Sequence, residues 1–345
     1  MRLAGDRDRL NRMAAGLGAI LSVLALWFVV VRPADAQPRP SFDCAKAASA
    51  VDRLICSHDK LASLDRALAE RYEALHDSLS PEGFAVLRKG QLTWLTARSE
   101  CLSKDHTRDQ AVACLSESYT TRTDELNAQF KSAGSLSIEK RVLARRLPRW
   151  RVDEADSYPW LVGSPRARVD AFNRYIAQRL QPAKGLFAAS GIKLDPKPDG
   201  DTTFSRYYEV HRFDDRLISI KFFLYHESYI GHGWRSEFVI NWDLKRDRPL
   251  RTADIFRPDR DWQQGIYDYA IKEIREEGEI QKPESWFSRD EVDDDDAWLF
   301  DDEEATLLLG HGERSMVGAS SDVSIPYEAL QPFLRPEFPV PDTGK

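Results

Sequence analysis

All four cysteines of this 345-residue chain lie within 71 consecutive residues, from Cys44 to Cys114, and the remaining sequence contains none. An even number of cysteines in a short segment is typical of exported domains that disulfides hold together. Cys44 and Cys56 are 12 residues apart, and Cys101 and Cys114 are 13 apart. These spacings favour two local pairs, although four cysteines allow three connectivities. A zinc site needs closer cysteine pairs, about two to four residues apart, which are absent.

Apolar residues at steps of three and four predict amphipathic helices in the same segment. Three are expected at residues 61–79, 84–101 and 112–126, with a shorter helix at 47–55. Between the first two long helices, Ser80 is suited to cap a helix N-terminus and Pro81 to occupy its first turn. Residues 42–130 are therefore predicted to form an all-α, disulfide-stapled domain.

Polar residues interrupt the apolar faces of these helices. Gln91, Arg98 and Arg122 occupy positions where a plain helical bundle would carry aliphatic side chains. A buried guanidinium is costly unless it is paired and hydrogen-bonded. One interpretation is an internal polar network that fixes how the helices meet. The alternative is a recognition surface around Trp94.

The same segment carries a series of short motifs. They are Phe42-Asp43-Cys44, Ile55-Cys56, Leu64-Asp65, Tyr72, Gln91-x₂-Trp94-x₃-Arg98-x₂-Cys101, Cys114-Leu115 and Tyr119-x₂-Arg122-x₃-Leu126. With these motifs the segment resembles the N-terminal domain of the LprI lysozyme-inhibitor family, a compact helical module of exported bacterial proteins. The resemblance implies lysozyme inhibition. Its family-motif residues here are Gln91, Trp94, Arg98, Tyr119 and Arg122.

The first 36 residues are typical of a secretory signal peptide. A basic start precedes 19 uncharged residues, from Met13 to Val31, and Ala34-Asp35-Ala36 is a small-x-small cleavage site. We expect cleavage after Ala36, so that a periplasmic or secreted chain begins at Gln37, which N-terminal sequencing checks. The alternative is an uncleaved membrane helix, because the apolar run is just long enough to span a bilayer.

A change of pattern follows the helical domain. Residues 131–156 are predicted to be a linker, in which a flexible break at 131–135 precedes a basic, helix-prone stretch at 140–151. That stretch is expected to be a solvated connecting helix, with contact to an anionic surface as the alternative.

Residues 157–335 are predicted to form an α+β domain with a mainly antiparallel sheet, which makes the protein multidomain. Strands are expected at 217–225, 238–242, 307–309 and 323–325, and helices at 172–180 and 266–274.

Short motifs also run through this second domain. They are Tyr158-Pro159, Ala171-Phe172-Asn173, Gly231-His232-Gly233, Leu250-x₃-Asp254-Ile255-Phe256 and Ile325-Pro326-Tyr327-x₂-Leu330. In them the domain resembles the extracellular domain of the RsiV type, also called DUF3298. That domain occurs in a lysozyme-sensing anti-sigma factor and beside the catalytic domain of some cell-wall deacetylases. Residues 314–318 replace the Pro-Tyr-small segment usual before its last strand.

No recognisable catalytic motif is present in either domain. His226 and His232 are six residues apart, whereas a helical zinc site needs histidines four apart. The chain lacks a Gly-x-Ser-x-Gly elbow and a phosphate-binding glycine loop. We therefore predict a binding protein with no cofactor, no metal and no catalytic residues. The net charge of −7 argues against a nucleic-acid partner.

An acidic strip, residues 291–304, contains nine acidic residues and no basic one. Aromatic anchors among charges are common at protein interfaces, so the strip is a candidate docking site for a cationic protein. A solvated loop and a calcium site are the alternatives. The candidate partner-binding residues are Asp293, Asp294, Asp295, Asp296 and Trp298 in this strip, and Tyr229, His232 and Trp234 in a loop expected between strands.

Taken together, these features predict an exported envelope protein that binds and inhibits lysozyme-like muramidases. Such enzymes use two carboxylates in a cleft that holds an extended glycan, so a rigid element that occupies the cleft is enough to block it. The alternatives are a non-catalytic module that binds peptidoglycan and a membrane-anchored lysozyme sensor. The sensor requires that the N-terminal helix stays in the membrane.

Overall fold

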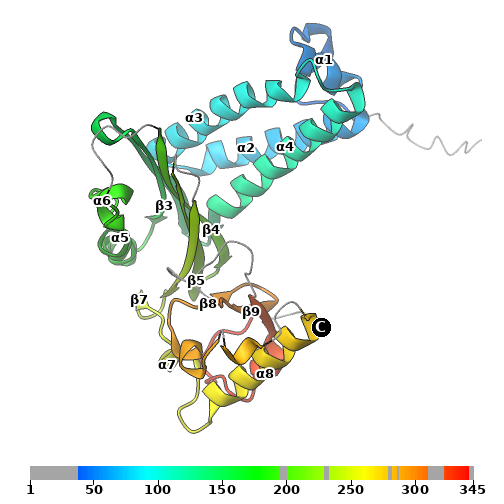
Figure 1. Ribbon diagram of the computed structural model, residues 1–345. Helices are drawn as coiled ribbons and strands as arrows, with labels where there is room; N and C mark the ends of the chain where they lie inside the picture. The colour runs from blue at the N-terminus through cyan, green and yellow to red at the C-terminus, as the bar shows by residue number, and fades with distance from the viewer. Residues whose placement is uncertain are drawn as a thin grey trace, which may run out of the picture.

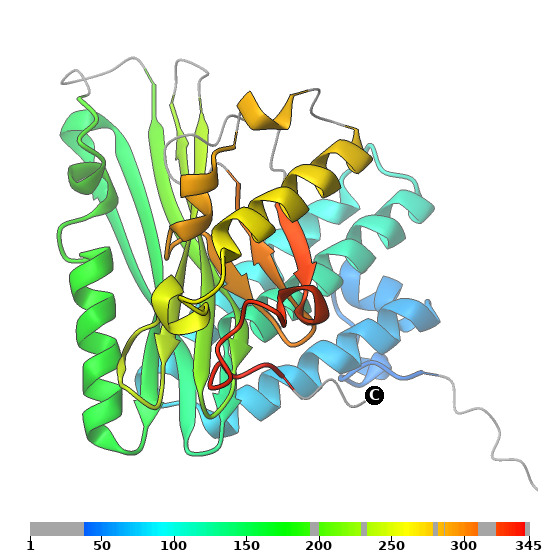
Figure 2. The same ribbon diagram turned by 90° about the horizontal axis from the view of Figure 1, so that it is seen from below.

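The computed structural model of the chain describes residues 38–193, 200–228, 233–278, 282–285, 287–309 and 322–341. An arm of long helices projects from a body built on β-sheets (Figure 1). The main sheet has seven strands, with a helix on one face and a second, three-stranded sheet with another helix on the other face (Figure 2). The predicted fold class, a helical domain followed by an α+β domain with a mainly antiparallel sheet, is confirmed.

Three long helices make up the arm, and a short helix lies at its far end (Figure 1). They are α2 (Asp59–Ser78), α3 (Pro81–Ala97), α4 (Arg108–Gln129) and the short α1 (Ala50–Cys56). The 3₁₀ helix η2 (Cys44–Lys46) precedes α1, and η3 (Arg98–Leu102) lies between α3 and α4. Leu61, Leu115 and Leu126 are almost fully buried between the helices. As predicted, Ser80 caps α3 by accepting a hydrogen bond from the Gly83 N–H, and Pro81 begins the helix.

The main sheet runs in chain order. Its strands are β1 (Lys131–Ala133), β2 (Leu136–Leu147), β3 (Val152–Gly163), β4 (Thr202–Phe213), β5 (Leu217–Glu227), β6 (Trp234–Asp243) and β7 (Arg248–Pro249). All neighbours are antiparallel except β3 and β4. A parallel pair needs a crossover connection. Helices α5 (Arg166–Leu180) and α6 (Leu186–Ser190) lie within that crossover.

Residues 131–156 are not a linker, and the connecting helix predicted there is wrong. They form β1, β2 and the start of β3. Strand β2 pairs with β3 along its whole length, from Leu136 opposite Gly163 to Leu147 opposite Val152. Two of its arginines find acidic partners outside the strand: Arg145 pairs with Glu154, and Arg146 pairs with Asp153 and Asp201. Cross-strand pairing of this kind overrides local helix propensity.

Both faces of the main sheet are covered. Phe172 and Ile176 of α5 pack on one face, where Phe172 meets Trp242 edge to face with ring centroids 5.5 Å apart. The other face carries the second sheet and α8, whose side chains form a separate hydrophobic cluster. The covering elements are β8 (Trp298–Phe300), β9 (Glu304–Leu307), β10 (Val323–Pro326), α7 (Thr252–Ile255), α8 (Trp262–Glu277) and α9 (Tyr327–Leu330).

Most of the elements predicted for the second domain are confirmed. The helices expected at 172–180 and 266–274 correspond to α5 and α8, and the strands expected at 217–225, 238–242 and 323–325 to β5, β6 and β10. The strand expected at 307–309 lies earlier, as β9. Strand β4, which contributes to both faces of the main sheet, was not predicted.

A buried carboxylate joins the arm to the body. Glu139 of β2 is fully buried, and its carboxylate accepts hydrogen bonds from the backbone N–H of Ser80 and, at 2.6 Å, from the Ser80 hydroxyl. The same carboxylate pairs with Arg141 at 3.0 Å. Gly83 provides the space, because a Cβ at this position would lie 2.6 Å from the Glu139 carboxylate. The body thus supplies part of the N-terminal cap of α3.

The C-terminal end of α4 is also tied to the body. The Tyr208 hydroxyl donates to the Gln129 carbonyl at 2.9 Å, and the Lys140 ammonium donates to the Gln129 side chain at 2.9 Å. One residue further, the Phe130 carbonyl accepts a hydrogen bond from Arg71 at 2.7 Å. Carbonyls at a helix C-terminus need such partners, because the helix itself leaves them without one.

Candidate functional site

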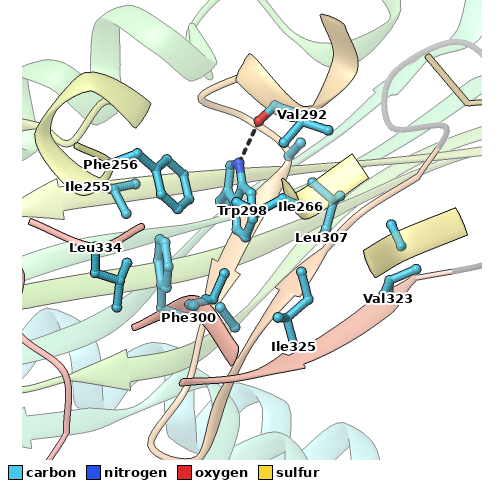
Figure 3. Packing of buried hydrophobic residues seen from close by; sticks show 14 of the residues in the cluster. Ile255, Phe256, Ile266, Val292, Trp298, Phe300, Leu307, Val323, Ile325 and Leu334 are labelled. Atoms are coloured by element: carbon cyan, nitrogen blue, oxygen red, sulfur yellow. Dashed lines mark hydrogen bonds between the residues drawn. The ribbon is translucent and has the colours of Figure 1, made fainter. Parts of the chain in front are cut away.

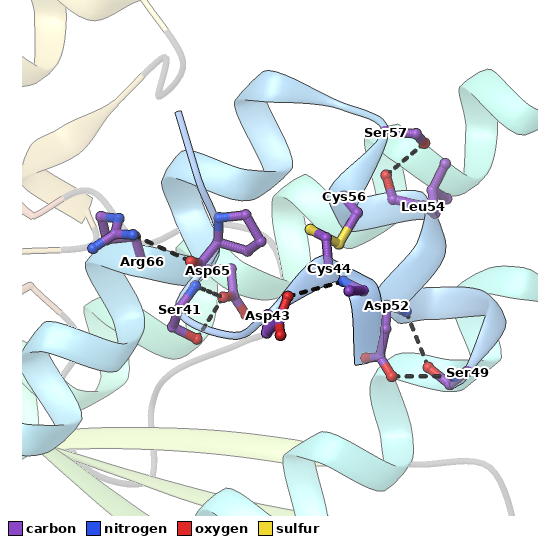
Figure 4. Close-up of a disulfide and its surroundings, with 12 residues drawn as sticks. Ser41, Asp43, Cys44, Ser49, Asp52, Leu54, Cys56, Ser57, Asp65 and Arg66 are labelled. Atoms are coloured by element: carbon purple, nitrogen blue, oxygen red, sulfur yellow. Dashed lines mark hydrogen bonds between the residues drawn. A yellow bond between two sulfur atoms is a disulfide. The ribbon is translucent and has the colours of Figure 1, made fainter. Parts of the chain in front are cut away.

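Two disulfides staple the far end of the arm. Cys44 and Cys56 link η2 to α1 (Figure 4), and Cys101 and Cys114 link η3 to α4. The two local pairs that the spacing favoured are confirmed. Disulfides of this kind persist in oxidising compartments outside the cytoplasm.

We expect chemical reduction to unfold the arm before the body. Each disulfide closes a loop of about the size for which roughly 3 kcal/mol of stabilisation is expected, and the body contains no cysteine. Hydrogen exchange followed by mass spectrometry, with and without reductant, measures the two parts of the chain separately. The body serves as the internal control, and an arm whose protection is unchanged by reduction contradicts the prediction.

The polar network predicted inside the helical domain is confirmed, and Tyr119 is at its centre. The Arg98 guanidinium donates to the Tyr119 hydroxyl, which in turn donates to the Asp65 carboxylate at 2.9 Å. Asp65 also accepts hydrogen bonds from the backbone N–H and the hydroxyl of Ser41, at 2.7 and 2.6 Å (Figure 4). Burial raises the pKa of Tyr119, which keeps its hydroxyl protonated as a donor.

A second branch of the network joins α3 to α4. The Arg122 guanidinium is buried, and its Nε donates to the Gln91 side-chain oxygen at 3.1 Å. The same side chain pairs with Glu125 at 2.9 Å. Gly90 lies against this guanidinium, since a Cβ there would be 3.2 Å from the Arg122 Nη2 atom. The buried positive charge is therefore both hydrogen-bonded and paired.

Trp94 belongs to the first branch of the network. Its ring meets Tyr119 edge to face with centroids 4.9 Å apart, and the Arg98 guanidinium carbon lies 5.4 Å from its centroid. The indole N–H donates to the Ser118 hydroxyl at 3.0 Å. These contacts leave the ring half-buried. All five family-motif residues are thus engaged inside the arm.

Replacing Tyr119 with phenylalanine is expected to lower the free energy of unfolding of the arm by about 1–3 kcal/mol. The change removes the hydroxyl that connects Arg98 to Asp65, and a buried polar group that loses its partner costs about that much. Urea unfolding measures the loss. Tyr72→Phe is the matched control, because Tyr72 is only half-buried; equal losses for the two variants would count against the network.

Trp298 is not a docking anchor, which corrects the prediction made from the acidic strip. Its side chain is fully buried in the cluster beneath α8, and its ring centroid lies 5.0 Å from that of Phe256 (Figure 3). Its indole N–H donates to the Val292 carbonyl at 2.9 Å. Asn241 of the main sheet donates to the Trp298 carbonyl at 2.6 Å. Strand β8 therefore lies against the sheet and directs this ring into the core.

The four aspartates before Trp298 make contacts within the body. Asp293 and Asp295 accept hydrogen bonds from the hydroxyl and the backbone N–H of Thr252, each at 2.7 Å. The Asp294 carboxylate accepts one from the backbone N–H of Asp296 at 2.9 Å. Asp296 also forms an ion pair with Arg179 of α5. The strip thus helps to hold α7 and α5, and the docking hypothesis has lost its aromatic anchor.

The other candidate partner-binding residues are only partly covered by the structure. Tyr229 and His232 lie outside the described residues, as do residues 314–318 and the predicted signal segment. Trp234 begins β6, and only its backbone is described. Within the described residues, no helix is long and apolar enough to cross a membrane. Nor does that part of the chain contain a group of three metal-ligand side chains.

A cleft that the sequence did not reveal opens at the far end of the arm. Its volume is about 470 Å³, and it lies between α1, η3 and the start of α4. We call it the tip cleft. It is lined by Ala50, Arg53, Leu54, Ser57, Leu102, Ser103, His106, Thr107, Arg108 and Ala111. The only signal in the sequence is that its basic residues lie within a few positions of the cysteines.

Comparison with known proteins gives a family match for the arm. Residues 44–126 match the model of the family described as "Lysozyme inhibitor LprI". Proteins named Lipoprotein LprI from Mycobacterium bovis and Mycobacterium tuberculosis are 29% identical to this chain over 114 residues. The match covers 32% of this chain and 54% of each relative, so it spans about half the length of those proteins.

Two solved structures are similar to a larger part of the chain. One is a DUF3298-family protein from Bacteroides fragilis, with a TM-score of 0.40, 14% identity and coverage of 61% of this chain and 95% of that one. The other is a DUF3298-family protein from Pseudomonas aeruginosa, with a TM-score of 0.35, 14% identity and coverage of 58% and 95%. Residues 44–126 of this chain are thus similar to the LprI family, and both disulfides lie within that range.

Proposed function

We propose that this protein is exported to the periplasm or beyond, where it binds a lysozyme-like muramidase and blocks its substrate cleft. The observation that carries the proposal is the match of residues 44–126 to a family described as lysozyme inhibitors. The matched range contains both disulfides and the five residues that we expect to be family motifs. Inhibition by occlusion needs a rigid surface and no catalytic group, and the stapled arm is such a surface.

The contact surface that we propose lies on α3. Leu92 and Leu95 are 56% and 38% exposed, the two large apolar side chains that the arm presents most openly among its described residues. They are three positions apart and so lie on one side of the helix. Apolar side chains that become buried supply much of the binding energy at protein interfaces. In this arrangement the polar network behind them keeps α3 in place.

Lysis of bacterial cell walls by a purified muramidase, measured with and without the purified protein, tests the proposal. We expect inhibition that saturates at a fixed ratio of protein to enzyme. The variant with Leu92→Glu and Leu95→Glu should bind the muramidase at least tenfold more weakly. Val142→Glu is the matched control, because Val142 is 39% exposed but lies on β2 of the body.

Two results would contradict the proposal. The first is the absence of binding to any lysozyme, which removes it entirely. The second is equal weakening by the α3 variant and by the control, which rejects α3 as the contact surface. A pull-down on isolated cell walls, run in parallel, tests the alternative that the protein binds peptidoglycan and not an enzyme.

A further inference from the structure

The tip cleft has a basic rim. Arg53, His106 and Arg108 line it, and no acidic residue does. Arg108 Nη2 donates to the Ser57 hydroxyl at 2.8 Å, and Arg53 Nη1 donates to the Ala48 carbonyl at 2.7 Å. Among the described residues, neither guanidinium has a carboxylate within 4.0 Å. Each therefore keeps donors for an anion, and guanidinium groups bind carboxylates through several hydrogen bonds at once.

His106 adds a third polar group to the rim. Its Nδ1 atom lies 2.9 Å from the Cys101 carbonyl, and a carbonyl can only accept a hydrogen bond. Nδ1 therefore carries the hydrogen, and this contact fixes the orientation of the ring. The other ring nitrogen, Nε2, does not take part in this bond. The positive end of the α4 dipole is at the same place, since Thr107 is its N-cap.

The floor of the tip cleft is apolar. Leu54 and Ala111 are buried beneath the rim, and Ala50 and Leu102 are the other apolar residues of the lining. Its volume, about 470 Å³, lies within the usual range for small-ligand sites. An inorganic anion would use the rim and leave this floor without a contact. A carboxylate attached to a small apolar group would use both.

The walls of the tip cleft are held by the two disulfides. Ser57 follows Cys56 directly, Leu102 follows Cys101, and Ala111 lies one helical turn before Cys114. A binding site whose walls are fixed before the ligand arrives loses less conformational entropy on binding. The cleft is therefore preorganised for a small ligand.

We propose that the tip cleft binds the free C-terminal carboxylate of a peptide that ends in a small apolar residue. Arg53 and Arg108 contact the carboxylate, and Leu54 and Ala111 contact the terminal side chain. The site is separate from Leu92 and Leu95 on α3 and does not depend on the binding of a muramidase. Peptides of this chemistry occur as cell-wall stem peptides that end in D-alanine and as the C-termini of proteins.

Titration of the ¹⁵N-labelled protein with N-acetyl-alanyl-alanine, followed by NMR, tests the proposal. We expect saturable shifts of the backbone amides of Arg53, Ser57 and Arg108. The same peptide with an amidated C-terminus should bind at least tenfold more weakly, because it lacks the charge. The variant with Arg53→Gln and Arg108→Gln should also lose at least tenfold, whereas Arg88→Gln, an exposed change on α3, should bind like the parent.

The D-alanine and L-alanine forms of the peptide distinguish the two sources of such a ligand, the cell wall and the C-termini of proteins. Tighter binding of the D form identifies a cell-wall peptide, and tighter binding of the L form identifies a protein C-terminus; both support the site. Equal binding of the acid and the amide overturns the proposal. So does displacement of the peptide by an equal concentration of inorganic phosphate, or the absence of a saturable shift. Unfolding midpoints confirm that the glutamine variants remain folded.

Discussion

Replacing Trp298 with alanine is expected to lower the free energy of unfolding of the body by about 3–5 kcal/mol, the usual cost of removing a large aromatic side chain from a core. Trp298 is fully buried, packs against Phe256 and Phe300, and donates its indole hydrogen to the Val292 carbonyl. The change leaves a cavity and an unpaired carbonyl. Urea unfolding measures the loss directly.

Trp160→Ala is a suitable control for this experiment. Trp160 lies on β3 of the same body but is only partly buried, so we expect a loss of about 1 kcal/mol. If Trp298 were an exposed anchor for a partner, its replacement would leave stability unchanged and weaken binding only. A stable Trp298→Ala protein would therefore contradict the packing of β8 against the main sheet.

Glu139→Ala is expected to cost about 3–5 kcal/mol, because a buried charge pair that loses one partner leaves the other uncompensated. Glu139 is fully buried, pairs with Arg141 and accepts two hydrogen bonds from Ser80. Its loss removes part of the N-terminal cap of α3 as well as the ion pair. We expect faster hydrogen exchange in the first turn of α3 and separate unfolding transitions for the arm and the body.

Glu82→Ala is the matched control for Glu139→Ala at the contact between the arm and the body. Glu82 is in the first turn of α3, the turn that Glu139 helps to cap, but its side chain is exposed to solvent. Its removal should therefore change the free energy of unfolding by no more than about 0.5 kcal/mol. Equal effects of the two changes would mean that the buried carboxylate does not hold the arm to the body.

The helical arm was largely predictable from its sequence. Apolar residues at helical spacing located α2, α3 and α4, and the Ser80-Pro81 pair marked where α3 begins. The same spacing placed Gln91, Arg98 and Arg122 inside the domain, where the polar network was found. Local patterns suffice here because a bundle of neighbouring helices is built from contacts along one face of each helix.

The basic stretch after the arm was misassigned for a physical reason. Arginines at 141, 145 and 146 look like the solvated side of a helix when the chain is considered alone. In the structure Arg145 pairs with Glu154 on the neighbouring strand, and Arg146 pairs with Asp201, which lies 55 residues away. Glu139 is another case, since its partner Ser80 lies 59 residues away. Long-range partners of this kind leave no local signal.

The acidic strip was misinterpreted for a similar reason. Charge and aromatic content suggested an interface, but the pattern could not show that all three residues of β8 are buried against the rest of the body. Thr252 and Arg179, which bind the aspartates, are respectively 41 or more and 117 residues away. The tip cleft was missed for the same reason, because two segments that are far apart in the sequence, 50–57 and 102–111, form its walls.

The length of the arm has a consequence for how many partners one molecule can hold. Helix α4 has 22 residues, so at 1.5 Å per residue it carries its far end about 33 Å from the sheet that it joins (Figure 1). A ligand in the tip cleft and a partner on the body would be too far apart to touch. A cell-wall peptide held in the tip cleft would thus tether the chain, so that the body stays at a fixed distance from the wall and at a raised local concentration there.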